Sequence, residues 1–66
     1  MAPAKTPEQI AAIFGCTIEQ AREQIRANAR QLRKDEAKAR AAAHGKLRGL
    51  PAEWYANRAQ AFEQVL

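Results

Sequence analysis

The sequence is poor in cysteine, histidine and aromatic residues: it has one cysteine, one histidine, one tryptophan, one tyrosine and two phenylalanines among 66 residues. The single thiol of Cys16 excludes a disulfide within the chain and fits a reducing compartment better than secretion. One cysteine and one histidine are too few for a zinc site, and the sequence has no glycine-rich phosphate loop. We therefore expect no metal and no other cofactor.

Long apolar runs are also missing. No stretch approaches the roughly 18 apolar residues of a membrane-spanning helix, and no apolar run resembles a signal peptide. The expected location is the cytoplasm, without membrane insertion. Catalysis is poorly supported as well, because Cys16 and His44, the only cysteine nucleophile and histidine base, lie at opposite ends of the longest predicted helix. We expect no catalytic residues and a protein that is not an enzyme.

The sequence is rich in residues that form helices. Between Thr17 and His44 there is no glycine or proline, and the residues are almost all Ala, Gln, Glu, Arg, Lys and Leu. These side chains lose little conformational freedom in a helix, so the stretch predicts a long helix over about residues 18–44. Thr17 and Gln20 form a capping box at its start, and Gly45 is expected to end it with His44 near its C-terminal dipole.

A short helix is expected before the long one, over about residues 7–14. Thr6 and Gln9 form a capping box around Pro7, which suits the first helical position. Gly15 is expected to end this helix in a left-handed conformation. Residues 1–5 are expected to be a flexible N-terminus.

A third helix is expected over about residues 51–65, with Leu50 as its N-cap and Pro51 at the first helical position. Short connections require the first and third helices to fold back on the long one. No alternating run of β-branched residues predicts a strand. The expected fold class is therefore all-α: a short helix, a long central helix and a return helix form a helical hairpin in one domain, residues 6–66.

Large apolar side chains are scarce, because alanine supplies much of the apolar content. So thin a core predicts that the chain pairs with a second copy. The long helix carries apolar positions at spacings of three and four, as in a coiled coil. The candidates for the dimer seam are Ile18, Ile25, Asn28 and Leu32. Asn28 would either set the register of a pair or simply be exposed.

Basic residues exceed acidic ones by 11 to 7, which gives a net charge of +4. Six of them form a basic stripe along the long helix: Arg22, Arg26, Arg30, Arg33, Lys34 and Lys38. One interpretation is a solvated face that Glu19 and Glu23 partly neutralise. The other is a surface for an acidic protein or for phosphates.

The first two predicted helices also look like a helix-turn-helix. Ala11, Gly15 in the turn and the later apolar positions Ala21 and Ile25 fit its tight angle. The long helix far exceeds a usual recognition helix, and its first turns carry acidic residues that repel phosphate. Binding of nucleic acid is therefore the weaker alternative.

The order in which helix-capping and packing residues follow one another along this chain is similar to that in a family of small proteins. The segments TPEQIAAIFGCTIEQAREQIRANARQLRK and GLPAEWYANRAQAFEQ, joined by a basic glycine loop, are similar to small helical proteins of Mu-like temperate phages. Leu50 and Pro51 depart from that pattern, which has Thr-Ala there. The family includes a dimeric anti-quorum-sensing protein that inhibits the host transcriptional regulator LasR and a pilus-assembly ATPase. The resemblance implies a cytoplasmic phage protein that binds and inhibits a host protein during host takeover.

We therefore expect a protein that binds a host protein, such as a quorum-sensing regulator, and inhibits it by steric blocking. Tryptophan, tyrosine and arginine are enriched in binding hot spots. The candidates for partner or dimer contact are Trp54, Tyr55, Arg58 and Phe62. The alternatives are a small DNA-binding regulator and a structural or assembly protein.

Overall fold

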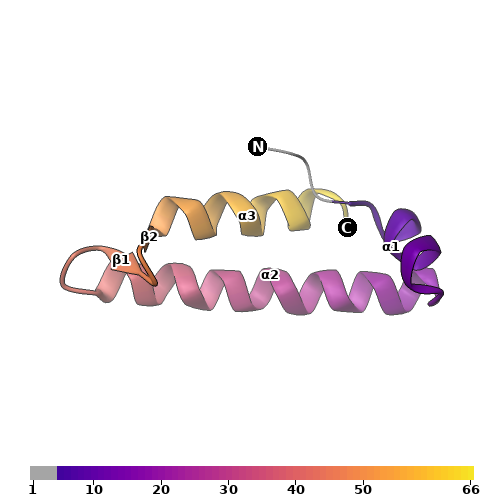
Figure 1. Ribbon diagram of the computed structural model, residues 1–66, viewed down its shortest axis with the longest axis horizontal. Helices are drawn as coiled ribbons and strands as arrows, with labels where there is room; N and C mark the ends of the chain where they lie inside the picture. Colours follow the sequence, from indigo (N-terminus) through magenta and orange to yellow (C-terminus); the bar gives the residue numbers. More distant parts are fainter. Residues whose placement is uncertain (1–4) are drawn as a thin grey trace.

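The protein is a helical hairpin with a short extra helix at one end. The computed structural model describes residues 5–66. The elements in order are α1 (Pro7–Phe14), α2 (Ile18–Ala41), β1 (Lys46–Leu47), β2 (Leu50–Pro51) and α3 (Ala52–Gln64). α3 runs back along α2 in a molecule of 41 × 20 × 17 Å, and α1 folds over the opposite end of α2 (Figure 1). The all-α expectation is confirmed, whereas the expected flexible N-terminus lies outside the described residues except for Lys5.

The starts of α1 and α2 follow from their capping residues. The backbone N–H of Gln9 donates to Thr6 Oγ1 at 3.2 Å, and Thr6 N–H donates to Gln9 Oε1 at 2.9 Å. Thr17 and Gln20 repeat both bonds at 3.0 Å. Gly15 ends α1 in the left-handed conformation, with φ 68°. Both predicted capping boxes are therefore confirmed.

The end of α2 differs from the expectation. The helix stops at Ala41 rather than near residue 44, and the Ala42 cap has extended dihedrals. The chain then turns, with the Gly45 N–H donating to Ala42 O at 3.0 Å. Because the helix ends early, the Leu47 side chain can pack against the core cluster. The burial of Leu47 stabilises the fold more than a few further helical residues would. His44 therefore lies in the loop and not at the helix end it was expected to cap.

A two-stranded hairpin, which the sequence pattern did not signal, connects α2 to α3. β1 and β2 pair antiparallel, with Leu47 opposite Leu50. Arg48 and Gly49, the two residues between the strands, have positive φ values of 53° and 77°, as a type I′ turn requires. Arginine in the place where asparagine is usual hides this turn in the sequence. Because Pro51 ends β2 and caps α3, the expectation that Leu50 caps the third helix was wrong.

The core lies between α2 and α3 and consists mostly of alanine. The buried apolar residues are Ala21, Ile25, Ala29, Ala39, Ala52, Tyr55 and Ala59. Tyr55 packs with Ala39 and Ala52, and the Tyr55 hydroxyl donates to Leu47 O at 2.7 Å. Tyr55, predicted as a contact residue, therefore packs inside the chain against an alanine of α2.

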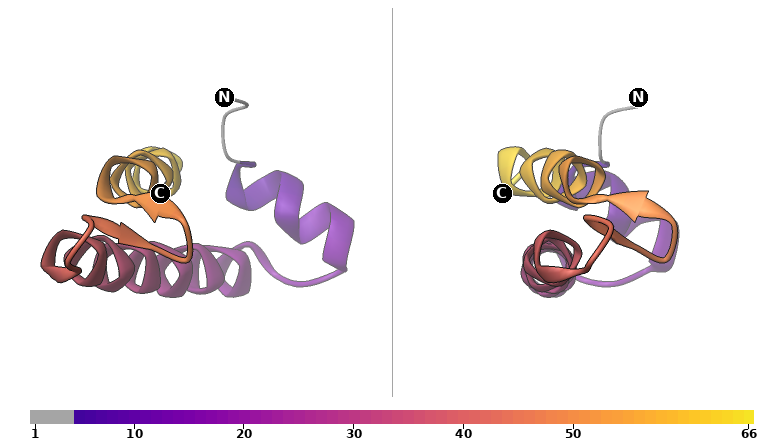
Figure 2. Two further views of the ribbon diagram at one scale, coloured as in Figure 1. Left: turned by 60° about the vertical axis from the view of Figure 1, so that its left-hand side comes forward. Right: turned by 90° about the vertical axis from the view of Figure 1, so that its left-hand side faces the viewer.

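α1 and the β-hairpin stand on the same side of the α2–α3 pair, one at each end of α2 (Figure 2). We call the surface between them the bounded face. It follows a stripe of α2 with spacings of three and four: Gln24, Asn28, Gln31 and Asp35. Gln24 and Asn28 line a hollow with α1, while Asp35 contacts the hairpin residue Arg48.

Replacing Tyr55 with phenylalanine tests the bond that holds the hairpin to α3. Tyr55→Phe removes the donor to the Leu47 carbonyl and should lower the free energy of unfolding by about 1 kcal/mol. Tyr55→Ala also leaves a cavity and should lower it by about 3–5 kcal/mol. Urea denaturation followed by far-UV circular dichroism measures both. An unchanged midpoint for Tyr55→Phe would show that the bond contributes nothing.

Candidate interaction surface

The four predicted contact residues of α3 divide into two groups. Tyr55 is only 2% exposed and belongs to the core. Trp54, Arg58 and Phe62 follow one another by one helical turn and form a stacked row. The Arg58 Cζ lies 5.9 Å from the Trp54 ring centroid and 5.4 Å from the Phe62 centroid. Cation–π contacts of this kind hold the arginine in place between two aromatic rings.

A second apolar surface lies at the other end of the molecule, on α1 and the start of α2. The Phe14 side chain is 74% exposed, Ile13 is 58% exposed and Ile18 is 44% exposed. The reason is geometric: an α1 of eight residues can bury only one stripe against α2, and Ile10 takes the half-buried position. An excess of large apolar residues on so short a helix was the available signal. We call Ile13, Phe14 and Ile18 the N-terminal apolar cluster.

A hollow of about 690 Å³ adjoins this cluster on the bounded face. Its lining comes from α1, the α1–α2 turn and α2: Ile10, Phe14, Cys16, Gln20, Ala21, Gln24 and Asn28. The surface of the lining is mainly apolar, and Gln24 Nε2 donates to Asn28 Oδ1 at 3.1 Å on its α2 side. The hollow therefore offers an apolar contact surface to a side chain of a partner, next to the bonded side-chain amides of Gln24 and Asn28.

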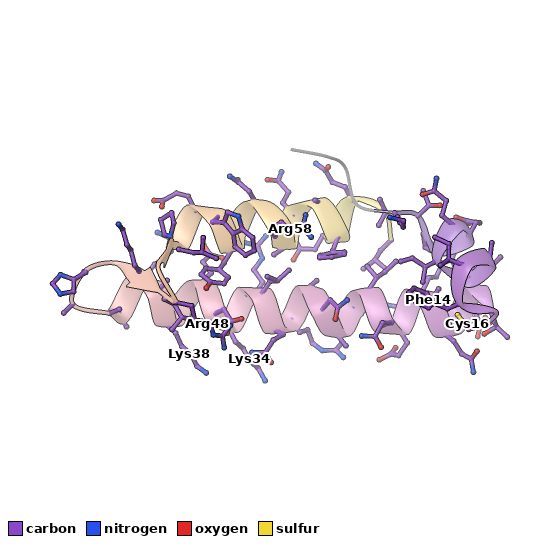
Figure 3. All side chains as sticks on the ribbon, in the orientation of Figure 1. Phe14, Cys16, Lys34, Lys38, Arg48 and Arg58 are labelled. Atoms are coloured by element: carbon purple, nitrogen blue, oxygen red, sulfur yellow. The ribbon has the colours of Figure 1, made fainter. Side chains whose placement is uncertain are left out.

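A buried carboxylate lies at the hairpin end of the bounded face. Asp35 is 4% exposed; it accepts from Gln31 Nε2 at 3.2 Å and lies 3.6 Å from Arg48 Nη1. The Arg48 side chain is itself 68% exposed. Figure 3 labels Arg48, Lys34 and Lys38 along the half of α2 next to the hairpin, and α2 contributes the two lysines one turn apart. We call Lys34, Lys38 and Arg48 the basic cluster.

The predicted basic stripe does not act as one surface. Arg26 and Arg30 both pair with Glu23, at 3.4 and 3.5 Å. The Arg33 side chain points towards α3, where it pairs with Glu63. Among residues 5–66, Lys34 and Lys38 have no carboxylate within ion-pair distance. In the described part of the chain, the stripe residues without an ion pair are therefore Arg22 at one end of α2 and Lys34 and Lys38 in the half next to the hairpin.

Arg33 links α2 to α3 through a bidentate ion pair. Its Nε and Nη2 donate to the two Glu63 carboxylate oxygens at 3.1 and 2.8 Å. Its Nη1 donates to Glu36, which also accepts from Arg40. These hydrogen bonds raise the pKa of Arg33 and lower the pKa of Glu63; those from Arg40 and Arg33 lower the pKa of Glu36. The role of Arg33 is thus to fasten the two helices.

The candidate dimer seam is only partly available. Ile25 is fully buried inside one chain, and Leu32 packs against the cluster of Ala39, Ala52 and Tyr55. Ile18 and Asn28 remain exposed. The fold has therefore covered Ile25 and Leu32, whereas Ile18 and Asn28 still face solvent.

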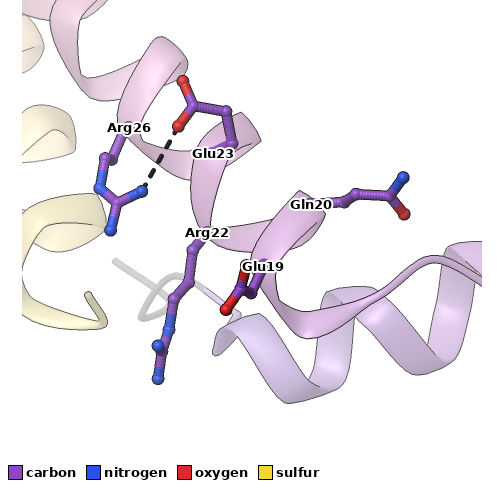
Figure 4. Close-up of a pocket in the computed structure, with 5 residues that line it drawn as sticks. All are labelled: Glu19, Gln20, Arg22, Glu23 and Arg26. Atoms are coloured by element: carbon purple, nitrogen blue, oxygen red, sulfur yellow. Dashed lines mark hydrogen bonds and ion pairs between the residues drawn. The ribbon is translucent and has the colours of Figure 1, made fainter.

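The first turns of α2, which a DNA recognition helix would present to the DNA, carry the acidic residues Glu19 and Glu23. A hollow of about 460 Å³ is lined there by Glu19, Gln20, Arg22, Glu23 and Arg26. Figure 4 shows the carboxylates of Glu19 and Glu23 beside the arginines of the same turns. Recognition helices present their N-terminal residues to the DNA, and carboxylates there repel phosphate.

Residues 5–66 contain no group of three or more His, Cys, Asp or Glu side chains placed to hold a metal ion. Within the same residues no helix has both the length and the apolar character needed to cross a membrane. Cys16 precedes α2 and His44 follows it, so the helix separates them as predicted.

Comparisons with protein-family models, with curated proteins and with solved structures find no match for this chain.

Acid should weaken the link between α2 and α3. The pKa values of Glu36 and Glu63 lie below their ordinary value, so their stabilisation is present above that value and is lost as the pH falls through the lowered values. Glu63→Gln should lower the midpoint of thermal unfolding slightly at neutral pH and make its acid dependence shallower below about pH 4.5. Glu53→Gln, on the same helix and without an ion pair among residues 5–66, is the matched control. Equal acid profiles for the parent and Glu63→Gln would contradict this assignment.

Proposed function

We propose that this protein acts without catalysis, by binding a partner protein and covering a surface that the partner needs. The observation that carries the proposal is the N-terminal apolar cluster, whose Phe14 side chain is 74% exposed beside an apolar hollow. Grouped exposed apolar residues mark protein–protein contact sites, and fully burying such a side chain is worth about 1.5–3 kcal/mol. A partner that covers this cluster gains that free energy.

The binding surface is formed before the partner arrives. α1 is held by its capping box, and the hairpin end by the Tyr55 bond to Leu47. The row of Trp54, Arg58 and Phe62 is likewise stacked in advance. Little conformational freedom remains to be lost on binding, which favours a steric blocker.

The resemblance to small proteins of temperate phages supports a host protein as the partner and the host cytoplasm as the location. A transcriptional regulator of quorum sensing is the target that this resemblance favours. A DNA-binding role is the weaker alternative, because Glu19 and Glu23 occupy the first turns of α2. A structural role would require assembly beyond a small closed oligomer.

We also propose that the working unit is a homodimer. In one chain the core is mostly alanine, and Ile25 is the largest side chain that is fully buried. Ile18 is the seam residue that is exposed and does not line the hollow. A second copy that covers Ile18 would add the apolar burial that so small a chain lacks.

Affinity capture from host lysate tests the proposed function. The immobilised protein should retain one or two partners in stoichiometric amounts, quantified by mass spectrometry. Phe14→Glu should abolish this retention, because it places a charge in the apolar contact. Ala12→Glu adds the same charge to an exposed position of α1 outside the lining of the hollow and should leave retention unchanged. No retained protein, or equal retention by both variants, would refute the proposal.

Sedimentation velocity tests the dimer. The parent should sediment with twice the mass of the 7.3 kDa chain, and Ile18→Glu should shift it towards the monomer. Ala12→Glu again serves as the control and should remain dimeric. A monomer mass that does not change with concentration would disprove pairing, and much larger assemblies would favour the structural alternative.

A further inference from the structure

We propose that the bounded face receives an acidic amphipathic helix of the partner protein. In this arrangement apolar side chains of that helix enter the hollow beside Phe14, and its carboxylates reach the basic cluster of Lys34, Lys38 and Arg48. The proposal rests on the proposed function and adds the chemistry of the partner segment.

The shape of the face sets the kind of segment that fits. α1 and the hairpin bound it at the two ends of α2 (Figure 2). From Gln24, in the hollow, to Asp35, beneath Arg48, α2 rises by about 16 Å, or about three helical turns. A helix lying along α2 would present side chains to both ends at this spacing.

The hollow end recognises apolar groups. Ile10 and Phe14 of α1 belong to its apolar lining, and Phe14 is largely exposed. The polar groups beside them, Gln24 and Asn28, are bonded to each other and carry no net charge. A leucine or phenylalanine of the partner therefore finds apolar contact there, whereas a phosphate finds neither a cation nor an unpaired donor array.

The hairpin end recognises carboxylates. The buried Asp35 is satisfied by Gln31 and Arg48, so it fixes the Arg48 side chain without neutralising its neighbours. Lys34 and Lys38 have no ion pair within residues 5–66, and Lys46 of β1 is exposed nearby in the chain. The three cations of the basic cluster against the one carboxylate of Asp35 leave this end positive.

The backbone of the turn supports a role for Arg48. Its φ of 53° places it in the left-handed region, which asparagine or glycine adopts more easily. An arginine at this position accepts backbone strain and in return places its guanidinium beside Asp35 and the two lysines. Strain kept at an exposed position is commonly associated with function.

Duplex nucleic acid is the competing ligand for the basic cluster. Phosphate binding would engage the cations but would leave the hollow and the N-terminal apolar cluster uncovered. It would also bring phosphates along a helix that carries Glu23, already shared by Arg26 and Arg30. An acidic amphipathic helix uses both ends of the face, so it is the occupant that the observations favour.

The test uses a fluorescein-labelled synthetic helical peptide with leucines at one end of a face and glutamates three turns further on. Fluorescence anisotropy should show saturable binding to the parent protein that weakens with salt. The same peptide should slow alkylation of Cys16, because this thiol lines the hollow and is the only one in the chain. A peptide with glutamine in place of glutamate should bind about tenfold more weakly.

Matched variants locate the site. The double variant Lys34→Glu with Lys38→Glu should weaken peptide binding at least about tenfold. Phe14→Glu should abolish protection of Cys16. Arg22→Glu, which also reverses a charge on α2 but lies away from both ends of the face, should bind like the parent. Circular dichroism on each variant verifies that the helices are retained.

The results separate this inference from the proposed function. If lysate capture depends on Phe14 but not on Lys34 and Lys38, and the peptide does not bind, the acidic helix is wrong while the proposed function stands. If a short DNA duplex binds and the peptide does not, the basic cluster is a phosphate surface and the inference is overturned. Equal binding by Arg22→Glu and the double lysine variant would also overturn it.

Discussion

The close packing of α3 on the alanine face of α2 is the constraint on which the rest of the structure depends. Ala39, Ala52 and Ala59 have no bulk to separate the two helices, so backbones can approach and Tyr55 can fill the space beneath the hairpin. Arg33 and Glu63 fasten one edge of this interface. The hydroxyl bond of Tyr55 fastens the hairpin end. With these contacts made, little room remains inside for other large side chains.

The excluded side chains become the surface that a partner can use. Phe14 and Ile13 lie outside the one stripe that an eight-residue α1 can bury against α2, and Trp54 stacks against Arg58 at the surface instead of entering the core. A thin core and an apolar surface are thus two results of the same packing. This relation connects the stability of the hairpin with its proposed role as a binding protein, since the apolar area missing from the core is the area offered outside.

Ion pairing sorts the arginines and lysines of α2 into different roles. Glu23 occupies Arg26 and Arg30, and Glu63 occupies Arg33, whereas Lys34 and Lys38 keep their charge unpaired within residues 5–66. A stripe that is continuous on a helical wheel therefore becomes one neutralised segment and one basic cluster. The proposed acidic ligand follows from this division, because only the hairpin end of the bounded face keeps an excess of positive charge.

Local sequence by itself determined the capped starts of α1 and α2, the glycine that ends α1 and the all-α class, because capping and helix propensity act within a few residues. The stop at Ala41, the hairpin and the exposure of Phe14 were decided only by tertiary structure. Burial of Leu47 competes with helix propensity, and an arginine in a positive-φ turn resembles no common turn signal. Likewise, Arg33 leaves the basic stripe because folding brings Glu63, 30 residues further along the chain, within 2.8 Å of it. Contacts between distant residues decide such outcomes, and local pattern does not contain them.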